Sequence, residues 1–320
     1  MRIISAILAM APRPPAAALA RWIRREVATD PPRAPSLIVT VWGDAIAPSR
    51  GVVWLSTLFR LLAPFGVNER AVRTGIFRLA KDTWFEAQPV GRRSRYQLMA
   101  AGAEGFERAF HRVYDPPFMR WEGHWEVVIV GPAATGAAAR KRLRDELAWA
   151  GFGRFGSAVY LRPARRDDAA ARIARSLRMD DALTAFVARD VAKSPLPSLR
   201  SRAAELWELG TLAGEYRRFI ARFGGVAAGL KRLRPDPQQA FVLRTLLVHA
   251  YRRVRLRDPQ LPRAVLPNDW PGADAYELAR TLYRITGPRA EAFVVTVLGE
   301  DAELAPRKPA NPEPRFADPA

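Results

Sequence analysis

Arginine side chains recur at helical spacing in the stretch GVNERAVRTGIFRLAKDTW, residues 66–84. A projection of residues 70–81 at about 100° per residue groups the apolar positions on one side, at Val72, Gly75, Ile76 and Leu79. The opposite side carries guanidinium, hydroxyl, aromatic and ammonium groups, at Arg70, Arg73, Thr74, Phe77, Arg78 and Lys81. Such groups bind phosphates, guanine edges and thymine methyls in a DNA major groove. The pattern predicts a helix with one core face and one DNA-binding face.

The residues around this helix define where it begins and what precedes it. Asn68 is a natural N-cap and Glu69 suits the positive end of the helix dipole, so the helix is expected to begin near Glu69. Upstream, apolar residues at helical spacing predict a second helix that ends at the turn of Pro64 to Gly66. The order is helix, turn, helix.

A basic hairpin is expected directly after the second helix. WFEAQPV has the pattern of a strand, GRRSR that of a turn, and YQL that of a returning strand, which places Arg92, Arg93 and Arg95 near the tip. These arginines are expected on phosphates or in the minor groove, whereas Lys81 is expected only to steer the DNA. Phe77 either touches a thymine methyl or is covered by the preceding helix. A lone basic helix is more often a solvated surface, but helix and hairpin together favour DNA binding.

Composition restricts the function classes. Lys plus Arg number 51 against 32 Asp plus Glu, a net charge of +19, which favours polyanionic partners such as nucleic acid. The absence of cysteine excludes disulfides, zinc-cysteine sites and thiol catalysis. No apolar run reaches the roughly 18 residues that span a bilayer, so we expect a cytoplasmic protein without membrane contact.

We find no constellation for catalysis or metal binding and expect no enzyme. GPAATG, residues 131–136, lacks the ending of a phosphate-binding P-loop, and Ser157 lacks the second glycine of a nucleophile elbow. His111 and His124 have no evident carboxylate partner at metal spacing. The carboxylate pairs Asp167–Asp168 and Asp180–Asp181 suggest helix caps and turns.

The chain divides by pattern into an α+β, multidomain protein of 320 residues. The expected parts are an extension with a short helix (1–34), a winged helix-turn-helix domain (35–115), a ferredoxin-like α/β sandwich (116–192), a mostly helical effector and dimerisation domain (193–304) and a proline-rich disordered tail (305–320). The sandwich rests on alternating strands and helices, with strands expected in WEVVIVG, FGSAVYLRP and ALTAFVAR.

One C-terminal helix offers a candidate effector site. Over residues 243–254, Leu243, Leu247, Ala250 and Val254 face inward, which leaves a second face with the polar side chains Thr245, His249, Arg252 and Arg253. That face either binds an anion or is simply solvated. Tyr251 and Trp270 offer stacking surface for an adenine or phenyl ring, although a tryptophan beside Pro271 is more often structural.

Three long blocks resemble one known family. Residues 41–98, which begin VWGDAIAP and end GRRSRYQL, resemble the N-terminal winged-helix domain of PaaX-type regulators of phenylacetic acid degradation. RTLLVHAYRRVRLRDPQLPRAVLPNDWPG, residues 244–272, is similar to the C-terminal domain of the family, and Trp121 and Trp125 stand where its middle domain begins. The resemblance covers about residues 20–300.

The resemblance implies a homodimeric repressor that binds double-stranded operator DNA and is released by phenylacetyl-CoA, without a cofactor. Three alternatives stay open: a regulator of another catabolic operon with a different acyl-CoA or aromatic effector, an enzyme that the winged domain tethers to nucleic acid, and a non-specific nucleic-acid scaffold. Sequence-dependent binding distinguishes a repressor from the scaffold, because the scaffold's affinity would follow salt alone.

Overall fold

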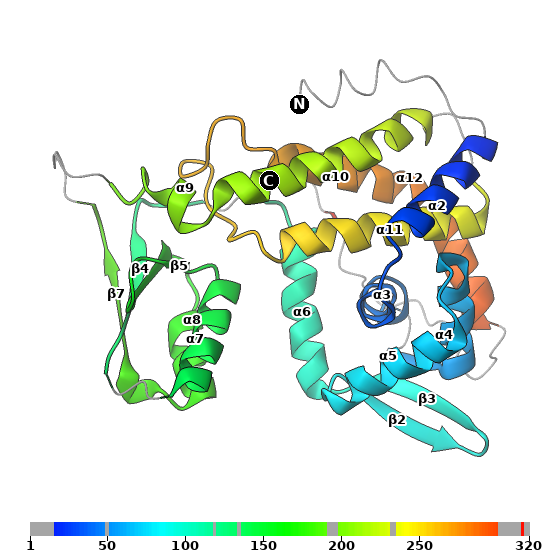
Figure 1. The fold of residues 1–320 in the computed structure, drawn as a ribbon, viewed down its shortest axis with the longest axis horizontal. Helices are drawn as coiled ribbons and strands as arrows, with labels where there is room; N and C mark the ends of the chain where they lie inside the picture. The colour runs from blue at the N-terminus through cyan, green and yellow to red at the C-terminus, as the bar shows by residue number, and fades with distance from the viewer. Residues whose placement is uncertain are drawn as a thin grey trace. The chain divides into compact units, whose positions relative to one another are not determined.

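The computed structural model describes residues 16–48, 51–117, 120–132, 136–190, 198–230, 235–299 and 315–316. The chain is α+β, with helices and two antiparallel sheets, and it forms two compact units (Figure 1). The first unit comprises residues 1–116, 219–253 and 274–320, and the second comprises residues 117–218 and 254–273. The three long C-terminal helices α10 (Leu209–Leu230), α11 (Pro237–Arg255) and α12 (Gly272–Gly299) each contribute residues to both units.

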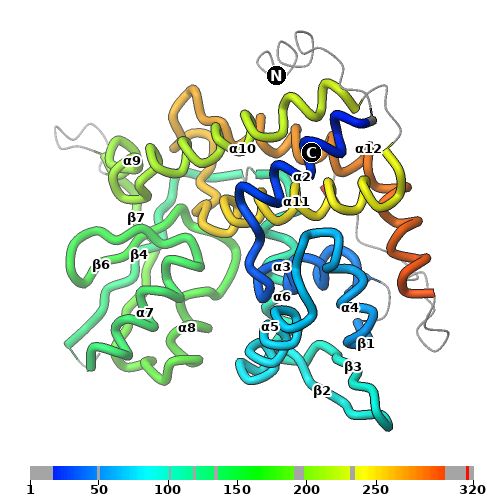
Figure 2. Tube along the Cα trace, turned by 45° about the vertical axis from the view of Figure 1, so that its right-hand side comes forward, coloured from blue at the N-terminus to red at the C-terminus, as the bar shows by residue number. Residues whose placement is uncertain are grey.

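The N-terminal part of the first unit combines helices with a small sheet. Its elements are α2 (Ala16–Thr29), α3 (Ala34–Val41), the π-helical η1 (Trp42–Ile46), β1 (Val52–Trp54), α4 (Leu55–Leu62), the 3-10 helix η2 (Ala63–Phe65), α5 (Glu69–Lys81), β2 (Phe85–Val90), β3 (Arg93–Leu98) and α6 (Ala100–Tyr114). The sheet has the order β1-β3-β2, and both of its pairings are antiparallel. The β2–β3 hairpin projects from the body of this unit beside α5 in both views (Figures 1 and 2).

The C-terminal helices complete the core of the first unit. Trp22 of α2 packs edge-on against Phe223 of α10, with ring centroids 5.7 Å apart. Arg60 of α4 donates a hydrogen bond from Nη2 to the carbonyl oxygen of Val297 on α12, at 3.0 Å. The helices that follow the sandwich in sequence therefore pack on the N-terminal elements, which are distant in sequence.

The second unit contains a sandwich of a four-stranded sheet and two helices. Its elements are β4 (Trp125–Val130), α7 (Ala137–Trp149), β5 (Gly153–Arg154), β6 (Val159–Pro163), α8 (Ala169–Leu177), η3 (Asp180–Ala182), β7 (Leu183–Ala188) and α9 (Ala203–Leu206). The strand order β5-β6-β4-β7 is antiparallel throughout, and α7 and α8 cover one face (Figure 1). The core between sheet and helices includes Val128, Leu143, Leu147 and Ile173. The element order is that of the expected ferredoxin-like arrangement.

Several local expectations were wrong. The strand expected in FGSAVYLRP forms as β6, but the short strands β1 and β5 were missed. The hairpin turn is only Gly91 and Arg92, because Arg93 already pairs with Val90. Gly91 has φ 58°, which a glycine adopts at little cost. The helix α12 continues through Pro288 without a break.

Other differences concern the tail and a histidine. Residues 305–314 and 317–320 lie outside the described residues, but Arg315 and Phe316 are packed in the first unit, and Phe316 is 0% exposed. The expectation of a disordered tail was therefore wrong at these two residues. His111 was expected to have no carboxylate partner at metal spacing; its Nδ1 lies 3.2 Å from Asp115 Oδ2, one helical turn away, which is an ion-pair contact within one helix and not a metal site.

The described residues contain neither a candidate membrane-spanning helix nor a candidate metal site. In that part of the chain no helix has both the length and the apolar character needed to cross a membrane. In the same residues, no group of three or more His, Cys, Asp or Glu side chains is placed to hold a metal ion.

A histidine lies at the contact between α3 and α11. Thr40 Oγ1 donates to the carbonyl oxygen of Ser36 and lies 2.8 Å from Nδ1 of His249, which is 8% exposed. Burial, followed by the charges of Arg252 and Arg253, lowers the pKa of His249 to about 4. The imidazole is therefore neutral at neutral pH, and one hydrogen bond joins its Nδ1 to the threonine hydroxyl.

We predict that His249 destabilises the fold in mild acid. The pKa in the folded state, about 4, lies below the ordinary value of 6.5, so the unfolded chain takes up the proton first as the pH falls. Unfolding is favoured by up to about 3 kcal/mol between pH 6.5 and pH 4. In urea unfolding followed across this range, His249→Gln should lose less stability than the wild type, with exposed His111→Gln as the control. Equal pH slopes for the wild type and His249→Gln would contradict the assignment.

A second prediction concerns two glycines of α6. A Cβ at Gly102 would lie 2.5 Å from the carbonyl oxygen of Trp84, whereas at Gly105 the nearest atom is Trp84 Cη2 at 4.0 Å. Gly102→Ala should therefore cost about 1–3 kcal/mol of unfolding free energy through overpacking. Gly105→Ala should gain up to about 1 kcal/mol from helix propensity. Thermal unfolding of both variants measures the difference, and two equal shifts would refute it.

Candidate nucleic-acid interface

The basic helix forms as expected and has the expected faces. α5 begins at Glu69, and the side chain of Asn68 caps it by accepting a hydrogen bond from the Ala71 amide at 2.8 Å. Its buried residues are Val72, Gly75, Ile76 and Leu79, so this prediction is confirmed. Arg70, Arg73, Thr74, Phe77, Arg78 and Lys81 are all exposed. The functional groups predicted to contact DNA therefore share one open helix face.

The helix is seated closely on α3. A Cβ at Gly75 would lie 3.0 Å from Ile38 Cδ1 and 3.3 Å from the Pro35 backbone nitrogen, so a larger residue would push the two helices apart. An open pocket of about 380 Å³ lies beside this contact between α3 and α5. Its lining includes Asn68, Arg70, Thr74 and Arg78 together with Ala34 and Pro35. The basic side chains thus border a concave surface beside the N-terminus of α3.

Two side chains of α5 differ in how they are held. Arg73 lies with its guanidinium carbon 4.8 Å from the centre of the Phe59 ring and forms an ion pair with Glu69 at 3.4 Å. Both contacts orient Arg73 across the helix surface. Phe77 is 68% exposed, so the alternative in which the preceding helix covers it was wrong. Burial of such an exposed ring against a binding partner would be favourable, because it removes apolar surface from water.

The hairpin arginines are distributed along β3. Arg92 lies exposed in the turn, while Arg93 and Arg95 lie on the strand and not at the tip. The Arg93 guanidinium stacks over the Trp54 ring at 4.1 Å, and Arg95 Nε donates to Gln88 Oε1 at 2.9 Å. Two of the three cations are therefore held in position by neighbouring strands, which reduces the entropy lost when they bind phosphate.

The predicted effector face of α11 is not open. Thr245 is 1% and His249 8% exposed, and Arg252 Nη2 lies 3.4 Å from Ser36 Oγ, so this face packs on α3. Both alternatives for this face, anion binding and a solvated surface, require it to be open, and both were wrong at Thr245 and His249, because periodicity does not reveal that distant residues cover a polar face. Tyr251 is fully buried and Arg253 is exposed. Trp270 belongs to the second unit, where its ring packs edge-on against Tyr216.

A buried polar cluster surrounds Asp44 of η1, and no local sequence pattern predicts it. Tyr114 and Tyr283 each donate a hydroxyl hydrogen bond to Asp44 Oδ1 at 2.9 Å, and Arg244 Nε lies 3.0 Å from Oδ2. Burial, followed by the Asp44 charge, raises the pKa of both tyrosines. Burial acts to lower the pKa of Arg244, but Asp44 with Tyr283 and Glu291 raises it above its ordinary value. Both tyrosines are therefore neutral donors, and Arg244 is a fixed cation.

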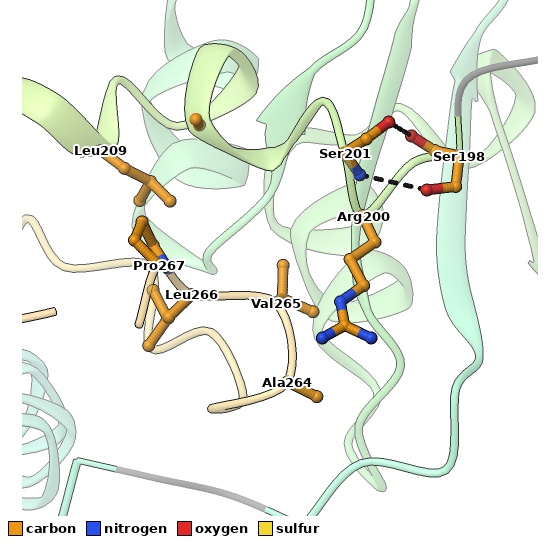
Figure 3. A pocket seen from close by; sticks show the side chains of 9 residues that line it. Ser198, Arg200, Ser201, Leu209, Ala264, Val265, Leu266 and Pro267 are labelled. Carbon is orange, nitrogen blue, oxygen red and sulfur yellow. Dashed lines mark hydrogen bonds between the residues drawn. The ribbon is translucent and has the colours of Figure 1, made fainter. Parts of the chain in front are cut away.

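The second unit has an open pocket of about 340 Å³ near α9 (Figure 3). Its wall is apolar at Leu209, Val265, Leu266 and Pro267, and Arg200 reaches across toward Val265. The hydroxyls of Ser198 and Ser201 are engaged in the local turn, at 3.1 and 2.7 Å. The volume is at the low end for small-molecule sites. Arg200 is thus the main polar group available to a ligand here.

Three family models match successive parts of the chain and together cover most of it. Residues 33–102 match the PaaX-like protein model, residues 119–199 the PaaX protein central Cas2-like domain, and residues 207–296 the PaaX-like protein C-terminal domain. The central match coincides with the sandwich of the second unit.

Individual proteins agree with the family match. The chain is 32% identical over 275 residues to the Transcriptional repressor PaaX of Escherichia coli (strain K12), across 85% of this chain and 86% of that protein. It is also similar to the solved structure of the uncharacterized protein Rv0674 from Mycobacterium tuberculosis, at 25% identity and a TM-score of 0.50, across 81% of this chain and 97% of that one. The protein belongs to the PaaX family of regulators.

Proposed function

We propose that this protein is a transcriptional repressor of a phenylacetate catabolic operon. Family membership and the similarity to a bacterial transcriptional repressor support the class of function. The observation that carries the proposal is the open face of α5, where three arginines and Lys81 stand opposite a buried apolar face. A helix of this kind can enter a major groove while its other side stays on the core.

In this proposal the N-terminal elements act as a winged helix-turn-helix. α4 and η2 precede α5, which is the recognition helix, and the β2–β3 hairpin is the wing. Arg70, Arg73, Thr74 and Arg78 contact base edges or phosphates, Phe77 contacts a thymine methyl, and Lys81 steers. Arg92, Arg93 and Arg95 contact phosphates or the adjacent minor groove. Glu69 and Phe59 hold Arg73 before DNA arrives.

The repressor is proposed to act as a homodimer on a partly palindromic operator, with an aryl-CoA thioester such as phenylacetyl-CoA as the releasing ligand. Such a ligand lowers DNA affinity only if it prefers one of two conformations of the protein. It must bind the conformation with low DNA affinity more tightly than the conformation with high DNA affinity. The first unit is suited to this coupling, because it contains both α5 and the helices that bury the Asp44 cluster.

We predict that alanine substitutions of arginines in α5 and in the proposed wing change DNA binding in different ways. Arg78→Ala should cost about 1–3 kcal/mol of operator affinity and relax sequence preference, because a base-reading contact is lost. Arg92→Ala should weaken all DNA about equally and reduce the salt slope by about 1. The control is Arg142→Ala, which removes an exposed arginine of α7. Anisotropy titrations on operator and scrambled DNA at several salt concentrations measure both effects; an unchanged Arg78→Ala variant would remove α5 from the interface.

A second prediction concerns release. At fixed salt, the protein should bind the promoter of a phenylacetate operon or of its own gene, and phenylacetyl-CoA should weaken that binding by about 5- to 150-fold, the usual range of allosteric coupling. Free phenylacetate and acetyl-CoA should have little effect. Specific binding that ignores the thioester would retain the repressor and reject this effector.

A further inference from the structure

Phe316, which follows α12 in the C-terminal tail, occupies an aromatic pocket in the first unit. Its ring is 0% exposed and is surrounded by tyrosines of three helices, with centroid distances of 5.1 Å to Tyr114, 5.8 Å to Tyr251, 5.6 Å to Tyr276 and 5.2 Å to Tyr283. These distances are those of favourable ring pairs. Phe316 is thus held as a ligand would be, by side chains distant from it in sequence.

Arg315 completes the docking of this dipeptide. Its Nη2 donates to the Gly43 carbonyl oxygen at 3.1 Å, and its Nε lies 3.7 Å from Asp44 Oδ1. The guanidinium also lies 5.5 Å from the ring centres of Phe110 and Tyr114. Phe316 has φ 55°, a backbone conformation that bulky residues rarely adopt. The docked tail therefore combines good side-chain contacts with a strained backbone.

The pocket does not need the tail to keep its charges compensated. Without Arg315, Asp44 retains Arg244 at 3.0 Å and the hydroxyl groups of Tyr114 and Tyr283. Tyr276 donates to the Tyr114 carbonyl oxygen and fixes that wall. Departure of the tail would leave no isolated buried carboxylate, which is the usual obstacle to such an exchange.

We propose that the four tyrosines form a binding site for the benzyl group of a small aromatic ligand, and that Arg315 and Phe316 are its tethered competitor. The phenylalanine side chain is itself a benzyl group, so an arylacetyl compound presents the same ring on the same methylene. The identification of that compound as phenylacetyl-CoA rests on the proposed function. Arg244 borders this pocket, with its guanidinium carbon 5.5 Å from the centre of the Tyr283 ring, and among the described residues its buried Nη2 has no acceptor, so it is a donor that a polar group of the ligand could use.

The position of the pocket connects it to the DNA-reading helix. Gly43 and Asp44, which hold Arg315, lie in η1, which continues α3 directly. α3 in turn touches α5 at Gly75. A ligand without a guanidinium that replaces the tail removes the contacts of Arg315 to η1. The ligand then changes DNA affinity only if the loss of these contacts favours one position of α3 over another.

The test uses full-length protein and a labelled peptide of residues 312–320. Phe316→Ala should bind the peptide about tenfold or more tightly than the wild type, whose own tail competes at high effective concentration. The exposed Phe186→Ala should behave as the wild type does, and a peptide with alanine at position 316 should not bind. Phenylacetyl-CoA should displace the peptide, whereas acetyl-CoA, which lacks the ring, should not; displacement by free phenylacetate would identify the acid as a second source of the ring.

Two outcomes would overturn the inference: no peptide binding by a folded Phe316→Ala protein, or binding that phenylacetyl-CoA does not displace. Should Phe316→Ala fold poorly, trypsin digestion of the wild type replaces it, because trypsin cuts after Arg315. Release of residues 316–320 should rise several-fold with phenylacetyl-CoA and not with acetyl-CoA, and an unchanged release would reject the site. If phenylacetyl-CoA displaces the peptide but leaves operator binding intact, the proposed effector response is rejected and the aromatic binding site is retained. If phenylacetyl-CoA weakens operator binding but does not displace the peptide, the aromatic binding site is rejected and the proposed effector response is retained.

Discussion

Asp44 is 3% exposed, so its charge has to be compensated inside the protein. The compensation comes from Tyr114 at the end of α6, Arg244 of α11 and Tyr283 of α12, which are distant in sequence. Each of these groups is costly to bury alone, because a lone carboxylate or guanidinium loses its hydration. Their mutual satisfaction requires η1 and the three helices to meet at one point. The first unit therefore unites the N-terminal elements with C-terminal helices.

This constraint extends toward α5, the helix proposed to bind DNA. η1 follows α3 without a break, and α3 contacts α11 through Thr40 and His249 and α5 through the close approach at Gly75. The position of α5 is thus set partly by helices that carry no DNA-binding residue. Packed interiors respond to small shifts by moving whole elements, because they contain few voids to absorb them. An effector that alters contacts on η1 acts on a body that already includes α5, the proposed recognition helix.

The sequence predicted features that depend on neighbouring residues. The faces of α5, its cap at Asn68 and the β2–β3 pairing follow from local periodicity and hydrogen bonding, and they were right. Features that depend on distant partners were missed. Nothing local distinguishes Asp44 from a surface carboxylate, and nothing local shows that the polar side chain of Thr245 is buried. The tail has the composition of a disordered segment, yet one ring and one guanidinium suffice to hold Arg315 and Phe316.

The excess of arginine includes two groups that composition alone cannot separate, namely buried arginines that pair with carboxylates and exposed arginines that are available to phosphates. Arg162, Arg244 and Arg255 are at most 2% exposed, and each has a carboxylate partner, at Glu126, Asp44 and Asp258 respectively. Their charges stabilise the interior and are not available to phosphates. Salt dependence counts only the cations that displace counterions from DNA. The electrostatic part of operator affinity should therefore follow the exposed arginines of α5 and the hairpin, and the net charge of +19 includes arginines that serve the fold instead.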